Sequence, residues 1–375
     1  MKKILAIFGT RPEAIKMAPL INELKKDFET KVCLTAQHRE MLDQVTKLFE
    51  LTPDYDLDIM KKDQNLFDLT SNLLINLRGV LEAEMPNLIL VHGDTTTTMA
   101  ASMSAFYLRI PIGHIEAGLR TNQKYSPFPE EINRQLTSKL ATYHFAPTES
   151  AKRNLMNENI EPNNIFVTGN TVIDALFSVL EKARDIDYPN ELLNKVPSLS
   201  HQKNQKKIIL VTGHRRENFG LGFRNICSAL AKVAKKYPDI ELIYPVHLNP
   251  NVTNPVKKYL SGIKNIHLVE PLDYLPFLKL LDDSFLVLTD SGGIQEEAPS
   301  LGKPVLLMRD ATERPEAVKA GTVVIVGTES DSIYTWVDKL ISNDDLYDKM
   351  SMAHNPYGDG YASKKIVKIL KESKF

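Results

Sequence analysis

Short apolar runs alternate with amphipathic segments along nearly the whole chain, and the apolar runs predict two series of β-strands. The first series covers residues 3–8, 31–35, 88–91, 112–115, 143–146 and 165–167. The second series covers residues 207–212, 241–245, 266–269, 284–289, 304–308 and 322–326. Helical or turn patterns fill the gaps; residues 14–26, for example, follow Pro12 and place apolar side chains on a recurrent face. Strands that alternate with helices in this way predict parallel sheets with crossover helices.

The two series are separated by a stretch in which the periodicity fades. Residues 183–206 are polar and contain Pro189, Pro197 and two basic clusters, which is typical of a linker. We therefore expect one domain over residues 1–182, a linker over 183–206 and a second domain over 207–361. The predicted fold class is α/β, with two Rossmann-like, doubly wound sheets facing across a cleft. The ligand is expected in that cleft, because ligands bind outside the carboxyl ends of parallel strands.

The composition excludes several classes of protein. Hydrophobic residues make up 43% of the 375 positions and charged residues 25%, which is typical of a globular chain of two domains. The 46 lysines and arginines balance 47 aspartates and glutamates, so the chain has no overall electrostatic attraction for nucleic acid or an anionic membrane. We expect neither as a partner, and any bound anion must be held by a local site.

The cysteines and the N-terminus indicate the compartment. Cys33 and Cys227 lie far apart in apolar segments, which favours free thiols in a reducing compartment over a disulfide or a metal site. The apolar run 4–8 is too short for a signal peptide, and no run approaches the ~20 residues of a membrane span. We therefore expect a cytoplasmic protein.

Three predicted strand ends carry residues suited to binding phosphate. The first strand runs into a Gly9-Thr10 turn with Arg11 and Lys16 near the start of the next helix, where amides, helix dipole and cations favour an anion. The alternative is an ordinary turn with solvated charges. After 207–212, His214 lies beside two arginines and is a candidate anion ligand.

The third of these strand ends gives the sharpest signal. Ser291-Gly292-Gly293 follows a strand and opens a helix, so backbone amides can approach a diphosphate closely. Glu297, one turn further on, can accept hydrogen bonds from ribose hydroxyls. Arg314, after the next strand, is a further clamp for the phosphates.

Acidic side chains at other strand ends are candidates for proton transfer. Asp94 follows the strand 88–91 as part of His92-Gly93-Asp94, and Glu116 follows 112–115 as part of His114-Ile115-Glu116. A third acid, Glu130, stands at the expected start of a helix, where acids often serve only as partners of the helix dipole. The two histidine and acid pairs can also ligate a metal, but they form no established metal motif, and we expect no metal.

No nicotinamide cofactor is expected either. Gly220-x-Gly222 lacks a third glycine at Asn225, and Gly358-x-Gly360 lies near the C-terminus with no strand before it. Neither matches the dinucleotide fingerprint, which needs three glycines between a strand and a helix. The sequence therefore predicts chemistry without a bound cofactor.

The motifs together resemble those of the bacterial non-hydrolysing UDP-N-acetylglucosamine 2-epimerases. The matching segments run in order over nearly the whole chain: 8–16, 91–95, 116–120, 212–217 and 290–293. The resemblance implies the two-domain fold that many nucleotide-sugar glycosyltransferases share (GT-B-like), a homodimer, and a last helix, within 362–375, that returns to the first domain. It implies reversible conversion of the UDP-sugar to UDP-N-acetylmannosamine, which supplies units for bacterial surface polysaccharide.

The resemblance also assigns roles to residues. UDP is expected to leave by elimination, giving 2-acetamidoglucal, and to add back after C2 is protonated on the opposite face. Asp94, Glu116 and Glu130 are the acid and base candidates, with His214 on the phosphate side. The residues implied in UDP binding are Arg11, Lys16, Leu272, Phe277, Ser291, Gly292, Gly293, Glu297 and Arg314. A second UDP-N-acetylglucosamine is implied as an activator, at Gln37, His38, Glu40, Asp63, Gln64, Arg215 and His247.

Other functions remain open from the residues alone. A glycosyltransferase of the same fold would share the nucleotide site but needs an acceptor pocket rather than three acids at C2. A hydrolysing epimerase would release free N-acetylmannosamine. A sensor of nucleotide sugars would bind without catalysis, but retention of the acids argues against it.

Overall fold

The computed structural model describes residues 1–35, 45–59, 64–200 and 206–375, and it divides into two compact units. Unit 1 comprises Met1–Ser178 and Tyr357–Phe375, and unit 2 comprises Val179–Pro356. The boundary falls inside helix α7 (Thr171–Asp185), upstream of the linker expected at 183–206. Part of that stretch instead forms helix α8 (Asn190–Lys195), which packs against strand β10 (Ile266–Val269) of unit 2.

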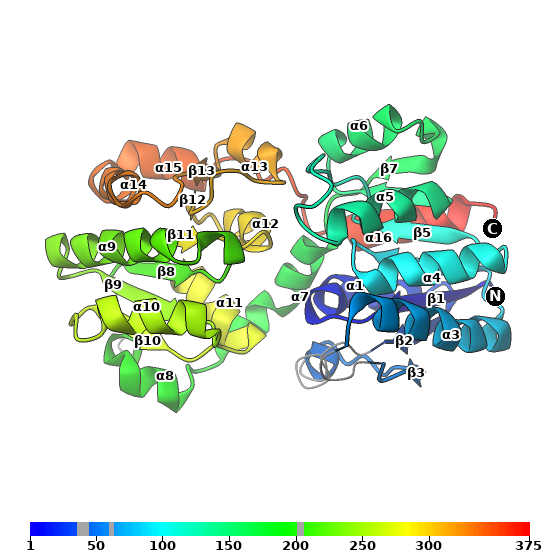
Figure 1. The fold of residues 1–375 in the computed structure, drawn as a ribbon, viewed down its shortest axis with the longest axis horizontal. Coiled ribbons are helices and arrows are strands. Elements are labelled where there is room, and N and C mark those ends of the chain that lie inside the picture. Colours follow the sequence, from blue (N-terminus) through cyan, green and yellow to red (C-terminus); the bar gives the residue numbers. More distant parts are fainter. Residues whose placement is uncertain (36–44, 60–63, 201–205) are drawn as a thin grey trace. The chain divides into compact units, whose positions relative to one another are not determined.

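Unit 1 is built on a seven-stranded sheet in the order β3-β2-β1-β4-β5-β6-β7, in which every pair is parallel (Figure 1). Its strands are β1 (Lys3–Phe8), β2 (Glu29–Leu34), β3 (Tyr55–Asp56), β4 (Leu88–His92), β5 (Ile112–Ile115), β6 (Tyr143–Ala146) and β7 (Ile165–Val167). The sequence pattern predicts all of these except β3. With only two residues, β3 is too short to form a recognisable apolar run.

Helices cover this sheet, and several begin at polar caps. They are α1 (Arg11–Leu24), α3 (Leu66–Glu84), α4 (Thr96–Tyr107), α5 (Glu130–Leu140), α6 (Glu149–Asn157), the short 3-10 turn η1 (Pro162–Asn164), α7 and α16 (Ala362–Glu372). Helix α1 begins three residues before the predicted start at 14, because Thr10 and Glu13 form a capping box and Pro12 fits the first turn. The C-terminal α16 packs against α1, within unit 1 (Figure 1).

Unit 2 has a six-stranded parallel sheet in the order β10-β9-β8-β11-β12-β13. Besides β10, the strands are β8 (Ile208–Thr212), β9 (Glu241–Pro245), β11 (Leu286–Thr289), β12 (Val305–Leu307) and β13 (Val323–Ile325). Besides α8, the helices are η2 (Pro197–Ser200), η3 (Arg216–Asn218), α9 (Leu221–Lys236), α10 (Pro250–Leu260), α11 (Tyr274–Asp283), α12 (Ile294–Ser300), α13 (Pro315–Ala320), α14 (Ser330–Ser342) and α15 (Asp344–Ser351). Strands β8, β11, β12 and β13 are slightly shorter than the apolar runs that predict them.

The register of the central strands gathers the loops that follow them. In unit 1, β1 lies between β2 and β4, so the strand order reverses there, and His92 of β4 pairs with Ile115 of β5. In unit 2, β8 lies between β9 and β11, and Thr212 pairs with Thr289. Loops that leave a parallel sheet at such a switch point are where this architecture places ligands. Each unit therefore offers one candidate loop cluster.

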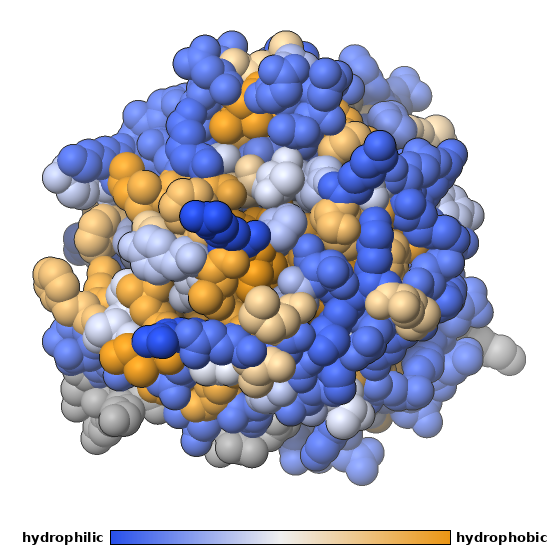
Figure 2. Space-filling view, turned by 90° about the vertical axis from the view of Figure 1, so that its right-hand side faces the viewer, coloured by the Kyte–Doolittle hydropathy of each residue, from blue (hydrophilic) through white to orange (hydrophobic). Residues whose placement is uncertain are grey.

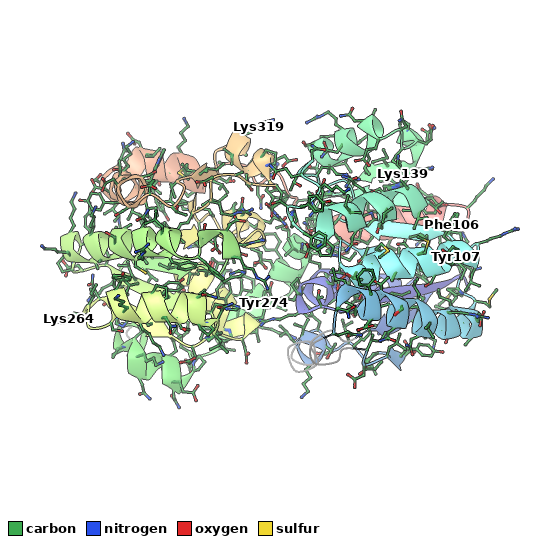
Figure 3. All side chains as sticks on the ribbon, in the orientation of Figure 1. Phe106, Tyr107, Lys139, Lys264, Tyr274 and Lys319 are labelled. Atoms are coloured by element: carbon green, nitrogen blue, oxygen red, sulfur yellow. The ribbon has the colours of Figure 1, made fainter. Side chains whose placement is uncertain are left out.

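Unit 1 also carries an exposed apolar surface over α3 and α4. Ile75, Phe106 and Tyr107 are 70%, 55% and 70% exposed. A hollow of about 350 Å³ beside them is lined by Leu74, Arg78, Glu82, Ser104, Tyr107 and Leu108. We call Ile75, Phe106, Tyr107 and this hollow the α3–α4 surface. Figure 3 labels Phe106 and Tyr107 on it, and Figure 2 shows apolar side chains gathered on this side of the unit.

Two findings concern the thiols and the helices. Cys33 and Cys227 are buried and free, and they belong to different units. Within the described ranges, no helix is long and apolar enough to cross a membrane.

Candidate active site

Glu116 lies at the centre of a polar cluster in unit 1. Its carboxylate forms an ion pair with Lys16 of α1 and accepts a hydrogen bond of 2.7 Å from the Asn170 side chain. The Nε2 atom of His92 lies 3.9 Å from the same carboxylate. Glu116 has a positive φ of 61°, a conformation that costs a non-glycine residue on the order of 1–3 kcal/mol. The loop after β5 thus holds Glu116 in a strained backbone conformation, with the side chains of neighbouring residues around its carboxylate.

Asp94 occupies the neighbouring loop, after β4. Its Oδ2 atom lies 2.7 Å from Nη2 of Arg134 on α5, and the Asn133 side chain donates to its backbone carbonyl at 3.0 Å. Burial raises the pKa of Asp94 to about 6; Arg134 opposes this shift, and the negative charges of Glu116 and Glu130 add to it. Asp94 can therefore exchange a proton near neutral pH, which a carboxyl with the ordinary pKa cannot do efficiently.

The structure separates the two adjacent acids at the start of α5. Glu131 is fully buried and accepts hydrogen bonds from the backbone amides of Thr121 and Asn122 at 3.0 and 3.1 Å. It therefore holds the preceding loop. Glu130 is only partly buried, and its charge acts on Asp94. Of the two acids, Glu130 remains available for chemistry.

The two histidines beside these acids are neutral. Burial lowers the pKa of His92 to about 4 and that of His114 to about 3. The Nε2 atom of His114 lies 2.7 Å from the Gly93 carbonyl, so the ring donates to that oxygen and fixes the turn that carries Asp94. His114 therefore holds the backbone of the turn that carries Asp94. No group of three or more His, Cys, Asp or Glu side chains that could hold a metal occurs in the described part of the chain.

The Gly9-Thr10 turn differs from the phosphate site that the sequence suggests. The buried carboxylate of Glu13 accepts hydrogen bonds from the Gly9 and Thr10 amides at 3.0 and 2.8 Å, and from the Thr95 hydroxyl at 2.6 Å. Glu13 thus occupies both of these amides in this structure, and the phosphate-binding role expected of the turn stays a prediction. Lys16 contacts Glu116, and Arg11 is half-buried at the first position of α1.

In unit 2, the buried Asp290 organises the loop that carries His214. Its carboxylate accepts from the backbone amides of His214 and Arg215, both at 2.9 Å, and from the Asn218 side chain at 3.2 Å. The His214 ring stacks on His247, with centroids 5.4 Å apart. Burial lowers the pKa of His214, and the negative charge of Asp290 opposes this shift.

The Ser291-Gly292-Gly293 turn lies beside the guanidinium of Arg314. A Cβ atom at Gly292 would stand 2.6 Å from Nη1 of Arg314, so only glycine allows this approach. Arg314 is 7% exposed and forms ion pairs with Glu296 and Glu313. Burial by itself would raise the pKa of Glu313, but Arg314 and Arg309 bring it down to about 2.

The remaining expected UDP ligands lie around α11 and α12. Glu297 is 8% exposed and accepts a hydrogen bond of 3.1 Å from the hydroxyl of Tyr274, which Figure 3 labels. Phe277 is half-buried on α11. Leu272 lines a cavity of about 320 Å³ together with Pro189, Leu192, Pro271 and Pro276.

The residues expected to bind an activator are only partly described. Gln37, His38, Glu40 and Asp63 lie outside the described residues. Gln64 is half-buried just before α3, Arg215 has a guanidinium nitrogen 4.0 Å from Glu313, and His247 is exposed and stacked on the His214 ring.

The chain matches the family model of UDP-N-acetylglucosamine 2-epimerase over residues 22–371. The chain belongs to the UDP-N-acetylglucosamine 2-epimerase family. It is 59% identical to the epimerase of Yersinia pestis, with 98% of both chains covered, and 57% identical to that of Escherichia coli K12, with 99% of both covered. The crystal structure of the Neisseria meningitidis epimerase bound to UDP-GlcNAc superimposes with a TM-score of 0.92 at 55% identity, covering 99% of this chain and 100% of that one.

The family and the α/β, GT-B-like fold class predicted from the sequence are confirmed, as is the prediction of an enzyme of the epimerase class. Within this epimerase, sequence reasoning missed several residues that hold the candidate acids and loops: Arg134, Asn170, Glu13 and Asp290. Arg134 stands in no glycine turn or motif, so no local signal identifies it. Asn170 follows Gly169 in the turn between β7 and α7, a strand end at which polar residues could have been considered. Glu13 and Asp290 lie inside the matched segments. The only sequence signal for their burial is that each lies close to the end of a predicted strand.

Proposed function

We propose that the chain interconverts UDP-N-acetylglucosamine and UDP-N-acetylmannosamine by inverting C2, without hydrolysing the sugar nucleotide. The relatives carry the name of this epimerase, and the Neisseria meningitidis structure contains UDP-GlcNAc. The observation that carries the proposal is the pair of acids Asp94 and Glu116 on adjacent loops of unit 1, each held by a different cation. A reaction that removes a proton from one face and returns one to the other needs two such groups.

The chemistry follows from the position of C2. This carbon is not next to a carbonyl, so its proton is weakly acidic, and no nicotinamide is proposed to oxidise C3. A carboxylate takes the C2 proton while the C1–O bond breaks, and UDP leaves with the bonding electrons. The product is 2-acetamidoglucal. A carboxyl group then protonates C2 on the opposite face, and the UDP oxygen attacks C1 to restore the bond.

The acids have environments suited to these steps. Burial gives Asp94 a pKa of about 6, so this group can both lose and regain a proton near neutrality. Glu116 is ion-paired with Lys16, which favours its carboxylate form and thus a base. Glu130 is the third candidate. In this scheme, either Asp94 or Glu116 can remove the C2 proton, and either can protonate C2 on the opposite face.

We assign most contacts to the nucleotide to unit 2. His214, Ser291, Gly292, Gly293 and Arg314 would receive the diphosphate. Charge that develops on departing UDP is stabilised by preorganised donors and cations. The other proposed contacts to the nucleotide are Arg11, Lys16, Leu272, Phe277 and Glu297.

Incubation with UDP-N-acetylglucosamine in heavy water, followed by NMR, tests the reaction. We expect deuterium at C2 in a mixture of the gluco and manno UDP-sugars. Asp94→Asn and Glu116→Gln should each lower turnover by about 10²–10⁴ while UDP binding is kept. Release of free N-acetylmannosamine would point to a hydrolysing epimerase instead. A protein that binds UDP but exchanges no deuterium would point to a transferase or a sensor.

The biological setting belongs to the same proposal. The product would supply N-acetylmannosamine units for bacterial surface polysaccharide. The reaction would take place in the cytoplasm, where buried free thiols such as Cys33 and Cys227 remain reduced. We further propose that a second UDP-N-acetylglucosamine activates the enzyme near Arg215 and His247, which a sigmoidal dependence of rate on substrate would support.

We also propose a homodimer that uses the α3–α4 surface. The surface exposes Ile75, Phe106 and Tyr107, and contact of their apolar atoms with water is unfavourable. Clusters of exposed apolar side chains mark interaction sites. Arg78 and Glu82 beside them form an ion pair at 2.7 Å.

A further inference from the structure

A side-chain amide contacts the central acid of unit 1. The Nδ2 atom of Asn170 donates to Oε2 of Glu116 at 2.7 Å, the oxygen that also pairs with Lys16. Asn170 is 2% exposed and stands just before α7, 54 residues along the chain from Glu116. No motif in the sequence pointed to this residue.

Neighbouring groups fix the orientation of the Asn170 amide. Its Oδ1 atom accepts a hydrogen bond of 3.1 Å from the backbone amide of Val172. The oxygen is therefore engaged within its own turn, and the NH₂ group must face Glu116. The backbone amide of Asn170 donates in turn to the carbonyl of Tyr357 at 2.7 Å. Asn170 is thus held at both its side chain and its main chain.

The partner carbonyl belongs to the segment that returns to unit 1 from unit 2. Gly169 has a φ of 89°, and a Cβ there would stand 3.2 Å from the Tyr357 oxygen. A Cβ at Gly360 would stand 2.6 Å from the Phe177 ring. Glycines at these positions allow the two segments to pack closely. The second glycine pair noted in the sequence, Gly358-x-Gly360, thus has a structural role near the site.

We propose that Asn170 is a positioning residue for Glu116, and that the return segment Tyr357–Gly360 holds Asn170 in place. This inference rests on the acid and base role proposed for Glu116. A donor to a carboxylate favours the ionised form and fixes the direction of its lone pairs. Asn170 thus favours the ionised form of Glu116 and fixes the orientation of its carboxylate. The side-chain amide of Asn170 itself takes no part in proton transfer.

Two substitutions of Asn170 have different expected effects. Asn170→Ala removes the donor, and kcat should fall by about 10–100-fold with KM and UDP affinity near their wild-type values. Asn170→Asp keeps the shape but brings a second carboxyl within 2.7 Å of the Glu116 carboxylate, so the two cannot both ionise easily. The activity of this variant should fall as pH rises. At low pH the introduced carboxyl is protonated and donates the same hydrogen bond, so activity should recover.

The experiment measures deuterium exchange at C2 against pH for the full-length protein and its variants. Gly169→Ala should also lower kcat, because it displaces the Tyr357 carbonyl that holds Asn170. Asn265→Ala is the matched control: this buried side-chain amide donates to the carbonyls of Ala234, Tyr237 and Ile240 in unit 2, away from the Glu116 loop, so kcat should stay near wild type. Thermal melts and UDP calorimetry establish that each variant is folded.

The outcomes separate this proposal from the one on which it rests. Loss of exchange in Glu116→Gln, together with wild-type kcat in Asn170→Ala or a wild-type pH profile in Asn170→Asp, would overturn the positioning role alone. Undiminished exchange in Glu116→Gln would overturn the role of Glu116 and the positioning role with it. If Asn170→Ala fails to fold, the pH profile of the isosteric Asn170→Asp variant decides the question.

Discussion

At the scale of single residues, the partners of each acid decide what it can do. Glu13 and Glu131 are buried and accept several backbone or hydroxyl donors, so their charges are used to hold turns. The side chain of Asp94 accepts no such set of backbone donors; it pairs with Arg134, which also lies 3.4 Å from Glu131, and the pKa of Asp94 is raised to about 6. Residue type alone does not distinguish these cases.

The pH profile of exchange should report on Asp94. Burial gives it a pKa of about 6, above the ordinary 3.8, so its carboxylate form dominates only above about pH 6. Arg134→Gln removes the cation that opposes this shift, and the pKa should rise further. The limb of the profile that belongs to Asp94 should then move to higher pH, which measurement of kcat/KM against pH would detect. An unmoved limb would show that Arg134 does not act on the reacting acid.

The same shift has a consequence for stability. Because the folded-state pKa of Asp94 lies above its ordinary value, ionisation favours the unfolded chain. This destabilising contribution is absent at pH values below about 3.8 and grows as pH rises toward about 6. The buried carboxyl of Asp94 therefore lowers the stability of the folded chain when it ionises. The ion pair with Arg134 makes this loss of stability smaller.

At the scale of elements, the strand ends determine where the candidate residues lie. Strands β1, β5, β6, β7, β9 and β10 have the same bounds as the predicted runs. Strand β3 was missed because two residues carry no periodicity. Strand β12 is shorter than its apolar run, because a strand extends only as far as its backbone pairing, whereas burial of apolar side chains continues past it.

The N-terminus of α16 depends on one acid from α7. Asp174 accepts hydrogen bonds from the amides of Ala362 and Ser363 at 3.1 and 2.7 Å. Asp174→Ala leaves both amides without this acceptor and should lower the free energy of unfolding by about 1–2 kcal/mol. Denaturant unfolding measures the loss. Asp185→Ala, an exposed acid of the same helix, is the control and should change stability by less than about 0.5 kcal/mol.

At the scale of the whole molecule, each unit has a hydrophobic core of its own. One cluster joins β8, β9 and β11 to α9, α10 and α14 in unit 2, and another joins β1 and β4 to α3 and α4 in unit 1. The chain crosses from unit 1 to unit 2 inside α7 and returns at Tyr357. The return makes the C-terminal residues part of unit 1, so the proposed acids and the end of the chain share one compact unit.

The α3–α4 surface should control assembly. Tyr107→Lys places a charge where an apolar contact is proposed, so the mass measured by light scattering should fall from that of two chains to that of one. Met352→Lys is the control, because Met352 is also exposed, at 78%, but lies in unit 2. A Tyr107→Lys variant that keeps the wild-type mass would exclude this surface as the dimer interface.

The sequence by itself determined the α/β class, the two series of strands, the family and the acids Asp94, Glu116 and Glu130 as candidates, because strand periodicity and glycine turns are local signals. Only the tertiary structure decided which groups hold these acids. The Lys16–Glu116 pair spans 100 residues and the Asn170–Glu116 bond spans 54, and local patterns carry no information on such distant partners. Burial likewise separates Glu130 from Glu131, because neighbouring residues at the start of a helix point to different surroundings.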